Sequence, residues 1–189
     1  MAAHQPYRGH DYLRARLWRT YTEAWAIRSC LGLGGAIVDV GCYNGVADDV
    51  LYRYIGAPAD TVAWYLYDVF HDPPNGRRKW AHSLELEAEV RQRFADRPNV
   101  SICAGLLPMT LAVRPERIGC LLVDLNDPIL ELAVLEQLYD SIVPGGIVIV
   151  DDYGDNEYRA SQGIYRAFFE SRGQFIYESP TSQGIVIKR

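Results

Sequence analysis

Five short apolar runs recur along the chain, most of them separated by helix-like segments, and this alternation limits the fold more than any other feature. The runs cover residues 36–40, 61–68, 99–105, 118–124 and 147–154. Most positions in them are apolar, which is typical of strands buried on both faces of a sheet. Such strands, alternating with helices, predict an α/β fold with a single doubly wound, mostly parallel sheet.

Both ends of the chain add to this sheet. Residues 173–179 and 184–189 indicate two short strands that form an antiparallel C-terminal pair. Residues 11–31 have helical spacing, and their apolar residues recur four apart at Leu13, Leu17, Tyr21 and Trp25. A helix that packs this stripe on the domain explains the pattern, and a lid over a pocket is a compatible functional alternative. We therefore predict a helical N-terminal lid segment, 1–35, and one main domain, 36–189.

Composition and charge exclude several classes of protein. The chain has 189 residues and is 49% apolar, which suffices for one domain with a sizeable core. Its formal charge of -5 comes without a basic stripe, so nucleic acid is not expected as a partner. No segment reaches the ~18 apolar residues of a membrane span, so no membrane association is expected.

The cysteine pattern and the N-terminus indicate a reducing compartment. The four cysteines lie far apart and form no CxxC pair: Cys30, Cys42, Cys103 and Cys120. Free buried thiols are therefore expected instead of a disulfide framework or a zinc site. The first ten residues also lack the apolar core of a signal peptide. Together these features predict a cytoplasmic protein.

Glycines and acidic residues follow the first two strands, where ligands bind in such sheets. Asp39 leads into Gly41 and Gly45, a DxGxxxG spacing that permits a tight turn and a close approach of the backbone to a ligand. Tyr43 stands where a dinucleotide-binding GxGxxG motif needs glycine, which counts against a dinucleotide. Asp68 ends the second strand and suits the two hydroxyls of a ribose, although a helix cap or a loop aspartate is the alternative.

Three more carboxylates end the fourth and fifth strands. Asp124 follows one run, and Asp151 and Asp152 follow the other. Adjacent strands would bring these like charges within a few ångströms of one another, which is unfavourable without a compensating cation or proton. Oxygen ligands suit a hard cation such as Mg²⁺. The structural alternative is that one or two of these residues only cap the following helices.

Several of these motifs, taken in order, resemble a known family. They are "IVDVGCYNG", "YDVFHDPP", "GLLPMTL", "LLVDLND", "LYDSIVPGGIVIVDDYG" and "GIVIKR". The chain from about residue 36 to its end is similar to the macrocin O-methyltransferases (TylF/NovP-type), which are class I S-adenosylmethionine-dependent enzymes with a Rossmann-like fold. The first 35 residues have no clear counterpart. Family members are usually longer, which suggests a reduced lid and leaves room for a partner subunit in a homo-oligomer.

The resemblance implies a methyl donor, a metal and an acceptor. S-adenosylmethionine would be converted to S-adenosylhomocysteine, and the acceptor would be a hydroxyl of a sugar or of a glycosylated or polyhydroxylated small metabolite, as in natural product biosynthesis. Asp124, Asp151 and Asp152 fall on the family's Mg²⁺ positions. The residues implied at the methionine end, the ribose, the nucleoside and adenine are Asp39, Gly41, Cys42, Tyr43, Asn44, Gly45, Asp68, Phe70, Gly105, Leu106 and, beside the metal, Asp124.

One position departs from the family pattern. The family has Asp-Gly-Asp where this chain has Asp124, Leu125 and Asn126, and the second acid is its proposed general base. An amide cannot accept a proton in that role. Asp127 and His71 are the replacements, although Asp127 also suits a helix cap and His71 an ordinary loop. Alternatively, the metal acidifies the hydroxyl without a dedicated base, and Asn126 hydrogen-bonds the substrate.

Two other function classes compete with this interpretation. One alternative is a scaffold protein that binds S-adenosylmethionine without catalysis. Asn126 is consistent with this hypothesis, whereas the presence of all three aspartates argues against it. A nucleotide-dependent oxidoreductase on a similar sheet is disfavoured by Tyr43. The residues carry no readable code for the acceptor, because substrate pockets in this fold are built from variable loops.

Overall fold

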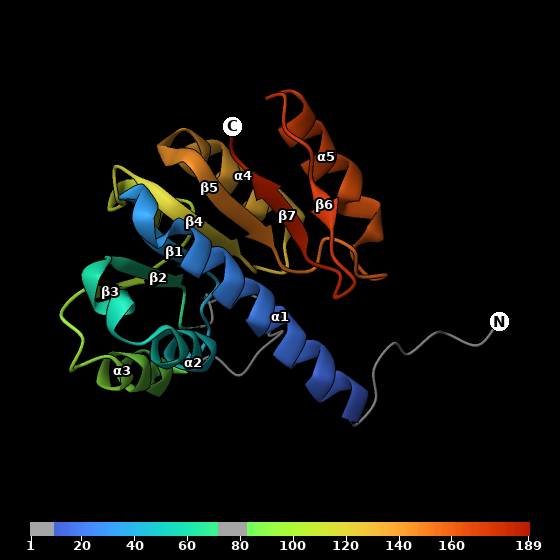
Figure 1. Cartoon of the computed structure of the whole chain (residues 1–189). Coiled ribbons are helices and arrows are strands. Elements are labelled where there is room, and N and C mark those ends of the chain that lie inside the picture. Colours follow the sequence, from blue (N-terminus) through green and yellow to red (C-terminus); the bar gives the residue numbers. More distant parts are fainter. Residues whose placement is uncertain (1–9, 72–82) are drawn as a thin grey trace.

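A computed structural model describes residues 10–71 and 83–189 and contains one seven-stranded sheet (Figure 1). The strand order is β3-β2-β1-β4-β5-β7-β6. The strands are β1 (Ala36–Val40), β2 (Trp64–Asp68), β3 (Val100–Ala104), β4 (Ile118–Val123), β5 (Ile142–Val150), β6 (Tyr177–Glu178) and β7 (Gly184–Ile187). The first five are parallel, and β7 runs antiparallel to β5 and β6. The predicted doubly wound sheet is confirmed.

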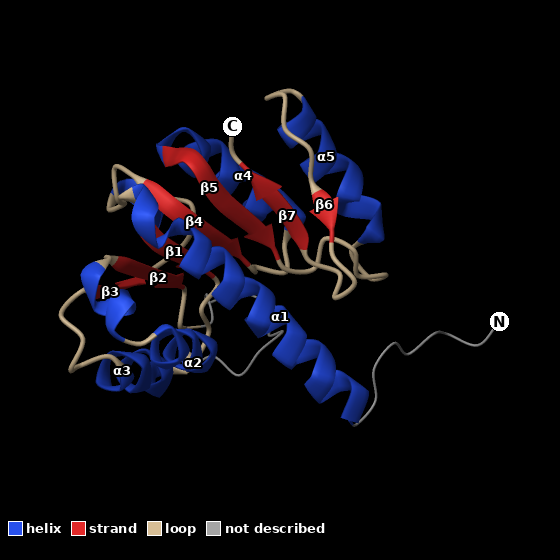
Figure 2. Cartoon of the chain, in the orientation of Figure 1, coloured by secondary structure: helices blue, strands red, loops and turns tan. Residues whose placement is uncertain are grey.

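Helices cover both faces of this sheet (Figure 2). One face packs against α1 (His10–Cys30), α2 (Val46–Ile55) and α3 (Leu84–Arg93), and the other against α4 (Pro128–Leu138) and α5 (Gln162–Glu170). Neighbouring strand residues alternate between the two cores: Cys120 and Leu122 face the first group, and Leu121 and Val123 the second. Burial on both faces explains the apolar sequences of β1, β2, β4 and β5, whereas β3, at the edge of the sheet, is only partly buried.

The fifth strand differs from the prediction at both of its ends. The sequence placed a turn at the Pro-Gly-Gly of residues 144–146, but β5 already begins at Ile142. Gly145 has φ +83°, and two backbone hydrogen bonds to the end of the chain hold this irregular segment in the strand: Gly145 N–H donates to Lys188 O at 2.7 Å, and Lys188 N–H donates to Gly146 O at 2.8 Å. The strand stops at Val150, so Asp151 and Asp152 lie in the turn beyond it. Of the strand expected over 173–179, only β6 forms.

Helix α1 packs on the domain, as expected, but not through the predicted stripe. Leu17, Tyr21 and Trp25 are 69%, 56% and 45% exposed. The buried residues are instead Ala24, Ala26, Ile27 and Cys30. Small side chains let the helix approach β4, β5 and α2 closely, and Figure 1 shows α1 crossing the sheet. The side chain of Leu13 lies outside the described part of the chain.

The prediction of buried free thiols is confirmed for three of the four cysteines. Cys30, Cys42 and Cys120 are buried, Cys103 is partly exposed, and all four are free thiols. No helix within residues 10–71 and 83–189 is both long enough and apolar enough to cross a bilayer.

Candidate active site

The candidate site lies where the winding direction of the sheet reverses. From β1 the chain moves outward to β2 and β3, then returns to the other side of β1 to form β4 and β5. The helices that follow β1 and β4 pack on opposite faces of the sheet, and ligands bind at the carboxyl edge beside such a point in sheets of this type. The residues predicted at the strand ends all follow these parallel strands, so they gather at this one edge.

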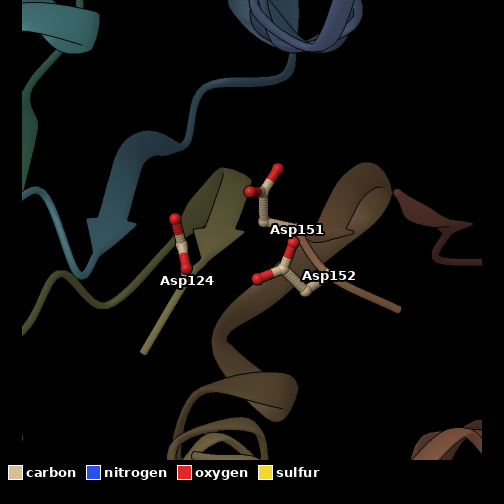
Figure 3. Close-up of side chains that lie close together, drawn as sticks. All are labelled: Asp124, Asp151 and Asp152. Atoms are coloured by element: carbon tan, nitrogen blue, oxygen red, sulfur yellow. The ribbon is translucent and has the colours of Figure 1, made fainter. Parts of the chain in front are cut away.

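Three carboxylates converge at this edge, as predicted (Figure 3). Asp124 follows β4, and Asp151 and Asp152 follow β5; each offers an oxygen within 4.8 Å of the others. Asp151 N–H donates to Val123 O at 3.0 Å, which holds the two strand ends together. Burial raises the pKa of Asp124 well above its ordinary value, and the charges of Asp151 and Asp152 raise it further. This group is electrostatically suited to a cation.

A cation that the sequence analysis missed already contacts this group. Arg19 of α1 places Nη1 2.7 Å from Asp151 Oδ2 and 2.9 Å from Asp152 Oδ1. Its Nε also donates to Thr181 O at 2.9 Å, in the loop before β7. Arg19 and Glu23 are four residues apart and therefore share one face of the helix. Two charged residues at this spacing could have indicated a polar face of the helix directed at the domain, but the prediction was based on the apolar stripe, which lies on another face.

Gln183 connects Glu23 to the same group. Its fully buried side chain donates through Nε2 to Asp151 Oδ1 and to Glu23 Oε1, both at 3.0 Å. Burial, followed by the charges of Asp151 and Asp48, raises the pKa of Glu23 to about 8. Glu23 is therefore mainly protonated in the folded protein at neutral pH. No local pattern indicated Gln183, because it is a single polar residue immediately before the apolar strand β7.

Glu23→Gln is expected to change how stability depends on pH. A carboxyl group whose pKa is raised by folding contributes stability below its unfolded value of 4.5, and this contribution is lost as the pH rises toward about 8. Glutamine mimics the neutral acid and keeps an oxygen for Gln183. The wild type should therefore lose unfolding free energy relative to the variant between pH 5 and 8, by up to ~1.4 kcal/mol per unit. Urea unfolding across this range measures it, and parallel curves would contradict the expectation.

Asn126 is oriented toward Asp124. Its Nδ2 donates to Asp124 Oδ1 at 2.8 Å, and its Oδ1 accepts from Tyr158 O–H at 2.7 Å. The backbone of Asn126 is left-handed, with φ +55°, a conformation that asparagine tolerates better than most residues. An amide at this position donates to the carboxylate, whereas an aspartate would bring a further negative charge against it.

The two residues proposed as bases have other partners in the structure. Asp127 is exposed and caps α4, accepting from Ile129 N–H at 3.1 Å and from Leu130 N–H at 3.2 Å. The alternative of a helix cap is thus confirmed, and a catalytic role for Asp127 stays a prediction. His71 Nε2 lies 3.3 Å from Glu87 Oε2 on α3. Its role as a base also stays a prediction.

Gly41, which begins the loop to Gly45, lies directly against the backbone of Asp124. Gly41 has φ +107°, and a Cβ there would overlap the carbonyl of Asp124. Asp124 N–H also donates to Val40 O at 2.9 Å. The structure thus shows a second reason for glycine at position 41, besides the approach of a ligand. Without a Cβ, the loops after β1 and β4 can make contact. Cys42 is buried, and Asn44 Oδ1 accepts from Val46 N–H at 3.1 Å at the start of α2.

Asp68 connects two loops at the end of β2. Its Oδ2 accepts from Tyr43 N–H at 2.8 Å, and its Oδ1 accepts from Phe70 N–H at 3.0 Å. Tyr43 and Phe70 both have positive φ, so the carboxylate fixes two strained turns. Gly105 N–H donates to Asp68 O at 3.0 Å, and Leu106 beside it is exposed. The contacts of these residues with a ribose and adenine stay predictions.

A buried carboxylate in the first turn of α2 was also missed by the sequence analysis. Asp48 is 1% exposed, and its carboxyl group lies against that of Asp39, while no N–H or O–H of the described residues donates to it. Burial raises the pKa of Asp48 to about 6. Burial, and then the charge of Asp48, raises the pKa of Asp39 well above its ordinary value. A cationic group of a ligand would compensate this pair of acids.

Comparisons with known proteins give the family. The family model Macrocin-O-methyltransferase (TylF) matches residues 34–170, whereas no curated protein matches the chain. The O-methyltransferase NovP superposes with a TM-score of 0.72 at 22% identity, covering 90% of this chain and 79% of its own. The calicheamicin methyltransferase CalS11 superposes with a TM-score of 0.75 at 16% identity, covering 92% and 80%. Methyltransferase PaMTH1 of Podospora anserina, bound to S-adenosylhomocysteine, gives 0.67 at 13% identity, covering 96% and 80%.

These solved structures share the fold, and the family model supplies the assignment. It spans both sides of the switch point, including the Gly41 loop and all three aspartates of the acidic group. The chain belongs to the macrocin O-methyltransferase (TylF) family and is a class I S-adenosylmethionine-dependent O-methyltransferase.

Proposed function

We propose that this enzyme methylates a hydroxyl of a sugar, or of a glycosylated or polyhydroxylated small metabolite, in a reaction that depends on Mg²⁺. The observation that carries the proposal is the convergence of Asp124, Asp151 and Asp152 beside the Gly41 loop at the switch point. One solved relative supports the choice of acceptor, since CalS11 is described as a TDP-rhamnose 3'-O-methyltransferase of calicheamicin biosynthesis.

The residues present fit S-adenosylmethionine. Its ammonium and sulfonium groups are cations, and the buried carboxylates of Asp39 and Asp48 provide opposite charge beside the Gly41 loop. Asp68, Phe70, Gly105 and Leu106 end β2 or follow β2 and β3 at the same edge, where the nucleoside would lie. When bound, the donor supplies an electrophilic methyl group and leaves as a neutral thioether.

The acidic group fits Mg²⁺ by its donor set. Asp124, Asp151 and Asp152 offer oxygens only, which is what a hard cation prefers. Within the described chain no hydrogen bond reaches Asp124 Oδ2 or Asp152 Oδ2, so both keep lone pairs for a ligand. When bound, Mg²⁺ would supply Lewis acidity and lower the pKa of an acceptor hydroxyl.

The protein's own residues would then orient the acceptor and receive its proton. The hydroxyl oxygen forms a bond to the methyl carbon while the carbon–sulfur bond breaks, so one proton must leave the oxygen. Asn126, which hydrogen-bonds Asp124 and Tyr158, would hydrogen-bond the acceptor. Asp127 stands next to it and is exposed, so it is the nearer of the two proposed proton acceptors along the chain, with His71 the second.

Calorimetry followed by a transfer assay tests this function. S-adenosylhomocysteine should bind and NAD should not; binding of NAD alone would instead support the oxidoreductase alternative. Methyl-labelled S-adenosylmethionine, incubated with a panel of nucleotide sugars and glycosides, should label at least one hydroxyl. EDTA should abolish the labelling and Mg²⁺ should restore it. Donor binding without transfer to any sugar or polyol of the panel would contradict the proposed substrate class.

A further inference from the structure

We propose that Arg19 is a built-in cation of the acidic group and that it competes with a divalent metal ion for Asp151 and Asp152. This inference rests on the proposed function, because it concerns the cation that the same carboxylates bind. It assigns to α1 a role that the motifs of the main domain do not reveal. The metal affinity of the enzyme would then be set partly by a residue outside the acidic group.

The guanidinium group of Arg19 lies between the carboxylates of Asp151 and Asp152. One nitrogen, Nη1, donates to Asp151 Oδ2 at 2.7 Å and to Asp152 Oδ1 at 2.9 Å. It therefore bridges the two carboxylates, as a shared metal ion would. Charge-assisted hydrogen bonds of this length are among the stronger polar contacts in proteins. The Arg19 side chain is only 21% exposed, so solvent screens the contact weakly.

Arg19 is also held by the loop before β7. Its Nε donates to Thr181 O at 2.9 Å, so the planar group is oriented by the loop before β7 as well as by the aspartates. Helix α1 itself is seated through buried Ala24 and Ile27. Arg19 therefore leaves the acidic group only by giving up Thr181 or by a shift of the helix.

In the described part of the chain, protein donors already occupy four of the six oxygens of the three carboxylates. Arg19 contacts one oxygen of Asp152 and one of Asp151, and Gln183 contacts the second oxygen of Asp151. Asn126 contacts one oxygen of Asp124. A metal bound to all three carboxylates must therefore share an Asp151 oxygen with a protein donor or displace that donor. A divalent ion beside the guanidinium would also be repelled by it. Weak metal binding in the wild type follows.

A titration with Mn²⁺ tests the competition directly, because free Mn²⁺ is measured by electron paramagnetic resonance without any substrate. Arg19→Gln should bind Mn²⁺ at least about tenfold more tightly than the wild type. Arg19→Lys keeps a positive charge at this position and should bind about as weakly as the wild type. Arg28→Gln is the matched control, since it removes an equal charge from an exposed position on the same helix and should leave the affinity unchanged.

The pattern of results separates this inference from the proposed function. Equal or weaker Mn²⁺ binding by Arg19→Gln, in a variant that melts at the wild-type temperature, would overturn the competition. If Asp152→Asn then lost the binding seen in the wild type, the proposed metal site would still stand. If Arg28→Gln tightened binding as much as Arg19→Gln, the effect would be general electrostatics and the inference would be wrong. No Mn²⁺ binding by the wild type and by Arg19→Gln alike would contradict both the metal site and the competition.

Discussion

Asp124→Asn is expected to lower the rate of methyl transfer at least about 100-fold while the folded structure persists. The substitution keeps the size of the side chain and removes one of three charges that converge at the switch point. A metal ion that polarises a substrate oxygen contributes several kcal/mol to the transition state, and each ~1.4 kcal/mol is a factor of ten in rate. Asp152→Asn should act in the same direction. Labelled methyl transfer at saturating Mg²⁺, with an acceptor from the panel, measures both.

The controls for this expectation separate catalysis from folding and from donor binding. Asp140→Asn removes an exposed acid at the other end of α4 and should retain full activity. S-adenosylhomocysteine should still bind Asp124→Asn and Asp152→Asn, because the opposite charge proposed for the donor comes from Asp39 and Asp48. Wild-type turnover in either variant of the acidic group would exclude its role in the reaction.

Gly41→Ala is expected to be the most destabilising small substitution in the site, costing roughly 3–5 kcal/mol of unfolding free energy. Two effects add. The backbone of Gly41, with φ +107°, is strained for any residue with a Cβ, and the new Cβ would overlap the carbonyl of Asp124. The two overlapping atoms, the carbonyl O and C of Asp124, belong to the backbone, so they cannot move aside without separating the β1 loop from the end of β4. Urea unfolding measures the loss.

Two other glycines make this a controlled comparison. Gly56 has φ +72° but nothing within 4 Å of its missing Cβ, so Gly56→Ala should show the cost of strain alone, roughly 1–3 kcal/mol. Gly163 lies in α5 with open space and no left-handed backbone, so Gly163→Ala should be neutral or stabilise by up to ~1 kcal/mol. If Gly41→Ala cost no more than Gly56→Ala, the overlap with Asp124 would not matter in solution.

The departure from the family pattern at Asn126 has a physical account in this structure. Two neighbouring aspartates and the raised pKa of Asp124 show that the site already carries unfavourable like charge. Asn126 adds a donor to Asp124 where an acid would add repulsion. Where the family pattern has a candidate base, this chain therefore has an amide that orients the carboxylate of Asp124.

The buried strands, the acids at their carboxyl ends and the start of α4 were predictable from the amino-acid sequence. Continuous apolar runs indicate strands buried on both sides, and parallel strands bring their carboxyl ends to one edge, so the grouping of Asp124, Asp151 and Asp152 followed from pattern alone. Pro128 in the first turn of α4 and the cap at Asp127 are likewise local features. They depend on backbone groups only a few residues away.

The amino-acid sequence was thus enough to predict the class of fold, the edge of the sheet that carries the site and the acids that gather there. Which cation faces those acids, and which buried carboxylates lie together, depends on tertiary packing. Arg19 reaches Asp151 across 132 positions of the chain, and Gln183 reaches Glu23 across 160. No periodicity encodes such contacts, because they arise from how α1 packs on the sheet and meets the loop before β7. Packing depends on the shape of the whole core, as the exposed stripe of α1 also shows.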